Sequence, residues 1–417
     1  MKEKIQHARS IFTSAVIVAA LGYFVDIYDL LLFSVVWKPS LKDIGISPDA
    51  LVPTGEMLIN IQMTGLLLGG ILWGVMGDKR GRLSVLFGSI VTYSLANILN
   101  GFIDEVWQYG LLRFIAGIGL AGELGAGITL VAESLPKEKR GWGTMLVAAV
   151  GVSGAVFASM MWRVLSDNGQ DISAWRTCYF IGGALGLALL IMRIGVYESG
   201  MFTNLVSQHV ERGNFLKLFT DRERFLRYLR CVLVGLPTWF SIGVLVTFCQ
   251  SFAEQLGVRG TVESGIAIMY AYSGITVGDF AAGYLSQILR SRRKALVSFL
   301  LITALGFVLY FTARGASAAY FYAIITLIGF GTGFWAVVVT NAAEQFGTNL
   351  RNTVATTVPN FIRGSLPVLM LLYKGLQTLL PPLQSAAVVA ALCIAVPLLA
   401  VYYSAETYGK DLEYVEV

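Results

Sequence analysis

The sequence predicts an all-α membrane protein whose twelve transmembrane helices form two pseudo-symmetric six-helix bundles. Composition is the first observation behind this fold class. Of the 417 residues, 56% are hydrophobic and 14% are charged, whereas soluble domains have about 45–50% apolar and about 25% charged residues. The 45 glycines fit the same class, because helices in lipid associate through small residues that let their backbones approach closely.

The second observation is a series of apolar stretches about 20 residues long, the length that crosses a hydrocarbon core of about 30 Å. The first stretch follows basic residues, as a signal peptide would. It is too long for that class and lacks a small-residue cleavage site, so we interpret it as a retained helix. The expected spans begin near Ile11, Met57, Leu83, Trp107, Trp142, Trp175, Tyr228, Ser264, Ala295, Ala318, Thr353 and Leu383.

The third observation is that the two halves of the chain resemble each other. Three glycines of the second span match three of the eighth at one constant offset, and a glutamate followed by an arginine ends an even-numbered span in each half. Two parallel six-helix repeats are typical of transporters with a site between the halves. The matched residues are Gly65, Gly69 and Gly74 with Gly274, Gly278 and Gly283, and Glu133 and Arg140 with Glu344 and Arg351.

Basic residues are concentrated in alternate connections between the spans, at 79–82, 137–140 and 290–294. Positively charged connections remain on the cytoplasmic side. We therefore expect a multi-pass plasma (inner) membrane protein with both termini in the cytoplasm. The longest polar stretch is predicted to separate an N-terminal six-helix bundle (1–196), a cytoplasmic linker (197–226) and a C-terminal six-helix bundle (227–417).

One connection carries a recognisable motif, Gly77-Asp78-Lys79-Arg80-Gly81-Arg82, between the second and third spans. It resembles the loop signature G-D-x-x-G-R-[RK] of the major facilitator superfamily, with Leu83 in place of the last basic residue. Glycines allow a tight turn, and Asp78 can accept hydrogen bonds from a helix terminus and hold one conformation shut. Gln287 stands at the aligned position of the second half, so we expect that copy to be degenerate.

The fourth span carries a second motif, Arg113-Phe-Ile-Ala-Gly117-Ile-Gly119-Leu-Ala-Gly122-Glu123, which continues to Glu133-Ser134-Leu135-Pro136. It is similar to the pattern R-F-x-x-G-x-G-x-G-G-E of metabolite:proton symporters and their sugar porter-like relatives, with Ala121 in place of one glycine. The resemblance implies the major facilitator fold, a secondary transporter, proton coupling and a monomer. It identifies no substrate.

Ionisable side chains inside a span are costly, so each is a candidate for function. Asp26 and Asp29 share one face of the first span, where two close acids favour a protonatable pair. Arg113 lies at a similar depth, and the resemblance places the first and fourth helices side by side. We predict an ion pair between Arg113 and one acid, with a proton competing; the alternative is a static buried salt bridge.

Glu123 lies deeper in the fourth span and completes the predicted proton-coupling set of Asp26, Asp29, Glu123 and Arg113. The alternative for Glu123 is a hydrogen bond to the first helix. The gating residues are predicted near the cytoplasmic interface, where charged pairs between helices can form and break. These are Asp78, Arg82, Glu133, Arg140, Glu344 and Arg351.

In the second half, Arg363 lies deep in the eleventh span, where an arginine is expensive unless it meets an acid, water or an anionic ligand. Its alternative partner is Asp279 of the eighth span. Aromatic residues near these charges can line a cavity, although core packing or anchoring at the lipid interface is the alternative. The predicted substrate-binding residues are Arg363, Asp279, Tyr28, Trp239, Trp335 and Asn341.

Several other classes are excluded. No phosphate-binding Gly-x-x-x-x-Gly-Lys loop is present, the two histidines, His7 and His209, are predicted outside the membrane, and the four cysteines have no paired spacing. The basic residues form no continuous face for nucleic acid. We therefore expect no enzyme, no cofactor, no bound metal and no nucleic acid, but a small-molecule substrate, protons and the lipid bilayer as partners.

The function that follows is secondary active transport, with proton-coupled uptake of a small organic anion by alternating access. The alternative is a transporter or exporter of a neutral, zwitterionic or cationic solute, including a metal cation, that uses the intramembrane acids. A transporter-like receptor that moves no solute is a further class, but a purely structural protein gains little from central charges.

Overall fold

The computed structural model describes residues 13–136, 139–167, 170–194, 212–262, 264–412 and 414–416. Within these ranges the regular structure is helical, apart from one isolated bridge between Arg259 and Ser317. The first twelve residues and the last residue lie outside the described part of the chain. So do His7, His209, Lys137 and residues 197–211 of the expected linker. The predicted bundle boundaries therefore stay a prediction.

The chain divides into two compact units, which do not follow the two halves of the sequence strictly. Unit 1 contains Met1–Phe215 together with Phe346–Asn360 and Asp411–Val417. Unit 2 contains Leu216–Gln345 and Phe361–Lys410. Two short segments from the second half thus belong to unit 1, and the contacts that hold them there are those of the charge cluster described below.

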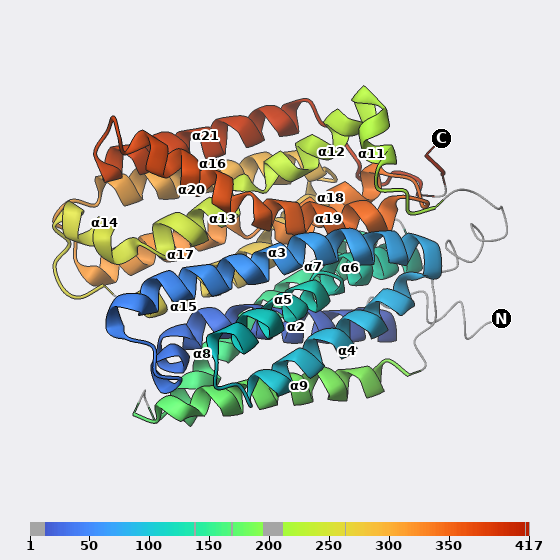
Figure 1. Cartoon of the computed structure of the whole chain (residues 1–417). Helices are drawn as coiled ribbons and strands as arrows, with labels where there is room; N and C mark the ends of the chain where they lie inside the picture. The colour runs from blue at the N-terminus through green and yellow to red at the C-terminus, as the bar shows by residue number, and fades with distance from the viewer. Residues whose placement is uncertain are drawn as a thin grey trace. The chain divides into compact units, whose positions relative to one another are not determined.

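The helices of unit 1 account for the first six expected spans, with the fourth and fifth spans each made of two consecutive helices. Within this unit α3 packs against α5, α4 against both α5 and α9, and α2 against α7 and α8 (Figure 1). The helices are α2 (Ser14–Asp43), α3 (Pro48–Arg80), α4 (Arg82–Asn100), α5 (Val106–Leu120), α6 (Glu123–Ser134), α7 (Arg140–Val152), α8 (Gly154–Leu165), the 3₁₀ helix η1 (Ile172–Ala174) and α9 (Trp175–Met192).

The helices of unit 2 account for the remaining spans, with α15 against α17 and α16 against α17 and α21. The eleventh span begins with α19 (Arg351–Gly364), through which the boundary between the units runs. The others are α11 (Lys217–Thr220), α12 (Arg222–Val234), α13 (Leu236–Phe240), the π-helix η2 (Ser241–Val246), α14 (Cys249–Leu256), α15 (Ser264–Ile288), α16 (Arg292–Thr312), α17 (Ala318–Thr332), α18 (Trp335–Gln345), α20 (Leu366–Leu376) and α21 (Pro382–Tyr402).

Ten helical stretches of the described chain are long and apolar enough to cross a membrane. The two expected spans that are not among them are the eighth, formed by α15, and the eleventh, formed by α19 and α20. These are the spans that carry Asp279 and Arg363. Such spans can lie in a membrane when the polar face is buried in protein.

The repeated glycines make the same kind of contact in each unit. A Cβ at Gly65 would overlap the carbonyl oxygen of Phe114, and a Cβ at Gly274 would overlap that of Thr326. These glycines therefore let α3 approach the backbone of α5, and α15 the backbone of α17. Close approach through small residues is how helices gain packing energy in lipid.

The turn expected in the first motif is a single residue. Helix α3 ends at Arg80 and α4 begins at Arg82, so Gly81 alone connects them. Its φ of 100° lies in the left-handed region, which glycine adopts at no steric cost and other residues adopt only with strain. This turn brings the residues at the end of α3 and the start of α4 into one place.

Candidate functional site

Asp78 lies against the start of α19 within unit 1. One of its carboxylate oxygens accepts hydrogen bonds from the backbone N–H (2.8 Å) and hydroxyl (2.7 Å) of Thr353, and the other accepts one from the N–H of Asn352 (3.1 Å). Arg82 lies 3.4 Å from the same carboxylate. A carboxylate at a helix N-terminus satisfies N–H groups that have no partner inside the helix and interacts favourably with the helix dipole.

Glu133, at the end of α6, is held by two arginines. Arg82 donates to both of its carboxylate oxygens, at 2.8 and 3.1 Å, and Arg351 donates to one of them at 2.8 Å. The side chains of all three residues are fully buried. Arg140, also predicted for gating, is buried at the first residue of α7. We call Asp78, Arg82, Glu133 and Arg351 the unit 1 gate cluster.

A short segment that follows the last span contacts this cluster. The carbonyl of Leu412 accepts hydrogen bonds from Arg351 (2.5 Å) and from the Thr348 hydroxyl (3.0 Å). The carboxamide of Asn349 exchanges two hydrogen bonds with the backbone of Glu416, at 2.9 and 3.0 Å. Leu412 and Glu416 therefore lie along the loop that precedes α19, and the carbonyl of Leu412 adds to the hydrogen bonds of Arg351.

Unit 2 contains a counterpart that the sequence reading missed. Arg292 donates to both carboxylate oxygens of Glu344, at 2.9 and 3.1 Å, the same two-point contact that Arg82 makes with Glu133. The expectation of a degenerate second copy is correct for Gln287, which replaces the aspartate, but it overlooked this retained pair. Glu344 also accepts a hydrogen bond from Thr407 at 2.8 Å.

Glu406 stabilises the start of α16, next to Arg292. Its carboxylate accepts hydrogen bonds from the Ser291 hydroxyl and from the backbone N–H groups of Arg292 (2.9 Å) and Tyr408 (3.0 Å). Burial alone raises the pKa of this carboxyl group, but these hydrogen bonds outweigh burial and lower its pKa. Glu406 is therefore held in its charged form at the N-terminus of α16, whose first residue is Arg292.

Arg113 and Asp29 are both fully buried in unit 1. Arg113 donates a hydrogen bond of 2.8 Å to Asn97, and its guanidinium lies 4.7 Å from the ring centroid of Tyr179. The carboxylate of Asp29 accepts no hydrogen bond from the described residues, although the charge of Arg113 acts on it electrostatically.

The predicted ion pair is therefore not formed in this structure. In the described part of the chain no ion pair joins Arg113 to Asp26 or Asp29, and Asn97 accepts a hydrogen bond from one guanidinium nitrogen of Arg113. Asp26 is buried on the same helix. Tyr28, predicted to contact substrate, donates to the carbonyl of Cys178 at 2.9 Å, which favours the packing alternative for this residue.

Glu123 has a partner that the sequence reading did not name. Arg193, just past the end of α9, forms a two-point ion pair with its carboxylate, and the second contact measures 3.2 Å. Neither side chain is exposed. A lone arginine at the end of an apolar span usually extends to the interface. The sequence therefore gives no sign that Arg193 turns inward to pair with Glu123. Within the described residues, the side chain of Glu123 contacts Arg193 and Ser89, and the hydrogen bond to the first helix that was the alternative is not formed.

The second-half candidates form a mixed polar and aromatic site within unit 2. Asp279 accepts a hydrogen bond from the N–H of Ala336 at 3.0 Å, and no ion pair joins it to Arg363 within the described residues. The guanidinium of Arg363 lies 5.9 Å from the ring centroid of Trp335. The indole N–H groups of Trp335 and Trp239 are buried and have no hydrogen-bond partner in the described protein. Such groups are available to a ligand.

Asn341 does not lie with this group. Its side-chain oxygen accepts a hydrogen bond from the Thr407 hydroxyl at 3.0 Å, and Thr407 also contacts Glu344. Asn341 thus lies beside Thr407 and Glu344 in the second half of α18, whereas Trp335 is the first residue of that helix. The structure places it among the gating residues rather than among the substrate-binding residues.

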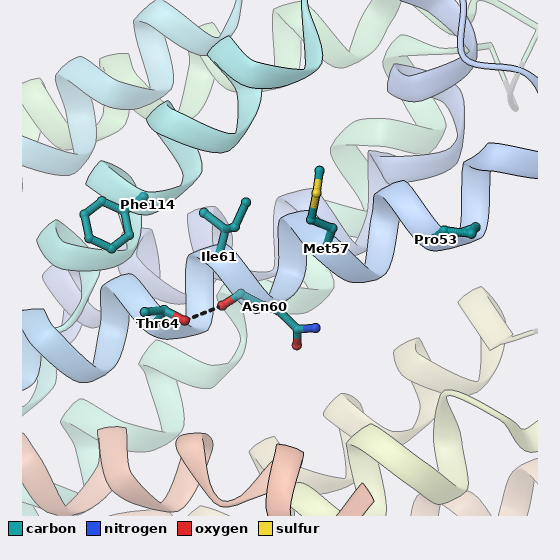
Figure 2. Close-up of a pocket in the computed structure, with 6 residues that line it drawn as sticks. All are labelled: Pro53, Met57, Asn60, Ile61, Thr64 and Phe114. Atoms are coloured by element: carbon teal, nitrogen blue, oxygen red, sulfur yellow. Dashed lines mark hydrogen bonds between the residues drawn. The ribbon is translucent and has the colours of Figure 1, made fainter. Parts of the chain in front are cut away.

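A cavity of about 640 Å³ opens on unit 1, at the end of α3 opposite Asp78. Figure 2 shows Asn60 extending from α3 into open space, and the hydroxyl of Thr64 donating to the Asn60 carbonyl at 2.8 Å. The sequence reading did not single out these residues, although two polar side chains one turn apart in an apolar span were a detectable signal. The lining residues are Pro53, Met57, Asn60, Ile61, Thr64 and Phe114.

Comparisons with known proteins add to this geometry. A family model described as Major Facilitator Superfamily matches residues 19–370. A metabolite transport protein of Haemophilus influenzae is 26% identical over 308 residues, covering 71% of this chain and 72% of the relative. A gentisate transporter of Corynebacterium glutamicum is 24% identical over 351 residues, covering 82% of this chain and 76% of the relative.

A solved structure of the proton:xylose symporter XylE has a TM-score of 0.78 to this chain, with 16% sequence identity. The match covers 97% of this chain and 98% of that one. At this identity the likeness concerns the fold. The predicted fold class, an all-α membrane protein with the transporter architecture of two six-helix bundles, is confirmed.

Proposed function

Because the chain belongs to the major facilitator superfamily, we propose that it is a proton-coupled secondary transporter that takes up a small organic anion by alternating access. That it is a multi-pass membrane transporter of small molecules, and not an enzyme, follows from the family. Proton coupling, the charge of the substrate and the direction of transport are the new elements of the proposal.

One observation carries the proton coupling, namely that Asp29 is buried near Arg113 and Asn97 but forms no ion pair with the guanidinium. A buried carboxyl group with no donor is more stable when neutral, whereas an ion pair with a nearby guanidinium stabilises its charged form. Protonation of Asp29 leaves Arg113 on Asn97, and deprotonation draws Arg113 toward Asp29. The proton and the ion pair thus compete, and the competition moves the helices α2 and α5 that carry them.

Arg363 supports an anionic substrate. It lies beside Trp335, whose indole N–H has no hydrogen-bond partner among the described residues, and the indole N–H of Trp239 in the same unit has none either. Indole N–H groups donate and cannot accept, so these groups and a guanidinium suit a carboxylate. The relative named for gentisate, a carboxylate, is in agreement. The alternative, a cation bound by Asp279, is weaker because one oxygen of Asp279 already accepts the Ala336 N–H.

We place the unit 1 gate cluster at the cytoplasmic surface of the inner membrane, with both termini on that side and a monomer as the working unit. The basic residues of the first motif support this side, since positive connections stay in the cytoplasm. The cavity at the opposite end of α3 would then lie on the periplasmic side. Periplasmic or cytoplasmic reporters fused after residue 416 test the orientation.

The function is tested with purified protein and four probes, the carboxylate gentisate, the neutral sugar xylose, the zwitterion betaine and the cation tetraethylammonium. Each is titrated at two pH values, and uptake into liposomes is driven by a pH gradient. We expect gentisate-type carboxylates to bind, and to bind more tightly as the pH falls, by up to about tenfold per pH unit for one linked proton.

Two variants sharpen this test. Asp29→Asn should retain binding but lose the dependence on pH, because the linked proton has no site. Arg363→Gln should lose affinity for carboxylates by about tenfold or more, since a charge-assisted contact is lost. Preference for tetraethylammonium over every carboxylate, or equal pH dependence in wild type and Asp29→Asn, would contradict the proposal.

A further inference from the structure

The fourth span is broken near its middle. Helix α5 ends at Leu120 and α6 begins at Glu123. Side chains satisfy carbonyl groups at the break, because Trp73 donates to Ile118 O at 2.6 Å and Asn360 donates to Ala121 O at 3.0 Å. Ala121 and Gly122 keep right-handed helical φ and ψ, so the break is a change in the hydrogen-bond ladder and not an unwound segment. Backbone groups that such a change frees at membrane depth need partners from protein or water.

The Glu123–Arg193 ion pair lies directly at this break. Arg193 binds both carboxylate oxygens and also donates to the carbonyl of Leu86 in α4 at 2.5 Å. The hydroxyl of Ser89 lies 3.5 Å from the same carboxylate. The first residue of α6 is therefore tied to α4 and to the end of α9 through one buried pair.

Gly22 of the first span makes room for this pair. A Cβ at Gly22 would overlap a carboxylate oxygen of Glu123 and a guanidinium nitrogen of Arg193. Asp26 lies four residues further along α2 and so on the same helical face. The pair thus contacts the first span one turn away from the acids of the proposed proton site.

The break separates two parts of the fourth span that carry different functional candidates. Helix α5 carries Arg113, which belongs to the proposed proton site, and α6 carries Glu133, which belongs to the unit 1 gate cluster. We propose that Arg193 is a positioning residue that fixes the break through Glu123, so that the Arg113 and Glu133 halves of the fourth span move together. This role rests on the proposed function, because it transmits the state of the proton site to the gate.

A static stabilising pair is the competing explanation. Buried ion pairs are weak contributors to stability, because desolvation of the two charges offsets most of their attraction. Removing one partner alone leaves an uncompensated buried charge and can prevent folding. The test therefore uses Glu123→Gln with Arg193→Gln as a double variant, which removes both charges and keeps polar side chains of similar shape.

Two further variants complete the set. Arg193→Lys keeps the positive charge and should retain part of the coupled transport that the double variant loses. Asp43→Asn with Arg176→Gln removes another ion pair of unit 1, whose atoms lie 3.4 Å apart outside the fourth span, and serves as the matched control. The first measurement uses spin labels at Leu111→Cys in α5 and Ser134→Cys in α6, whose native residues are exposed.

The distance between these labels reports the rigidity of the break and needs neither protons nor substrate. We expect a narrow distribution in the wild type, the control and Arg193→Lys, and a broad one in the double variant. The second measurement compares accumulation of gentisate under a pH gradient with gentisate counterflow at equal pH. The double variant should lose accumulation by about tenfold or more while counterflow stays near the wild-type rate.

An unchanged label distance in the double variant would overturn the proposal, as would a fall of accumulation and counterflow in equal proportion. Either result leaves the pair as a structural contact only. Failure of the proposed function is a separate result, because it appears as absence of accumulation in the wild type. In that case the label distances still decide whether Arg193 fixes the break.

Discussion

Arg351 Nη1 lies 2.8 Å from Glu133 Oε1, with both side chains fully buried, although 218 residues separate them in the chain. Arg351 begins α19, and Glu133 lies near the end of α6. This contact explains why Phe346–Asn360 belongs to unit 1. In the proposed mechanism these charges hold the gate closed, and their partners change if the eleventh span moves away.

Glu133→Gln should weaken the closed gate more than Arg351→Gln does. The first variant leaves two buried arginines without their carboxylate, whereas the second leaves Glu133 paired with Arg82. Removal of one partner of a buried ion pair costs about 3–5 kcal/mol. We expect a lower melting temperature and faster maleimide labelling of Thr356→Cys, a buried position on α19. The exposed Glu254→Gln is the control, and equal labelling in all variants would contradict the assignment.

Deletion of the residues from Asp411 onward should loosen the same gate by a smaller amount. The deletion removes the hydrogen bonds that Leu412 and Glu416 make with Arg351 and Asn349, and each is worth about 0.5–1.5 kcal/mol. Labelling of Thr356→Cys should rise, but less than in Glu133→Gln. Glu416→Gln is the matched control, because the bonds from Glu416 to Asn349 come from its backbone. A control that loosens the gate equally would show that side-chain charge matters instead.

Gly65→Ala should destabilise the protein strongly, because the new Cβ overlaps the backbone carbonyl of Phe114 and forces α3 away from α5. Gly375→Ala is a close comparison, since it lies in α20 and a Cβ there meets nothing within 4 Å. Alanine in an open helical position is favoured over glycine by about 0.5–1 kcal/mol. Thermal unfolding in detergent should show a loss in the first variant and no loss in the second.

Glu406→Gln should remove part of the protein's sensitivity to acid. The folded state lowers the pKa of Glu406, so its stabilising contribution is present above the unfolded pKa of about 4.3 and disappears as the pH falls through the lower folded value. The wild type should therefore lose stability over this acidic range. Glu406→Gln should be less stable at neutral pH and lose less on acidification. Parallel pH curves for the two proteins would contradict the role of this carboxylate.

The sequence predicted the fold and most of the gate for different reasons. The spans follow from apolar length alone, and Asp78 and Arg82 follow from a motif whose glycine turn is local. The repeat drew attention to Glu133 and Arg351, but it could not show that they pair with each other. Pairing depends on which helices meet, and no spacing along one segment contains that information.

Arg292 and Arg193 show where sequence reasoning fails. Arg292 is one of four basic residues at 290–294, a cluster that by itself indicates only a cytoplasmic connection. Within the described residues, Arg292 is the member of this cluster that pairs with Glu344. Arg193 stands at the end of a span, where arginines usually extend to lipid headgroups. In both cases the rotation of a helix about its axis decides whether the side chain turns inward, and composition does not fix that rotation.

The contact of Leu412 with Arg351 also has a consequence for biosynthesis. Leu412 follows α21, so the ribosome has already made all twelve spans before this carbonyl exists. Glu133 is synthesised before Arg351, so of these two contacts only the one with Leu412 depends on the segment after the last helix. The full set of contacts that Arg351 makes can therefore form only after the last span has been synthesised.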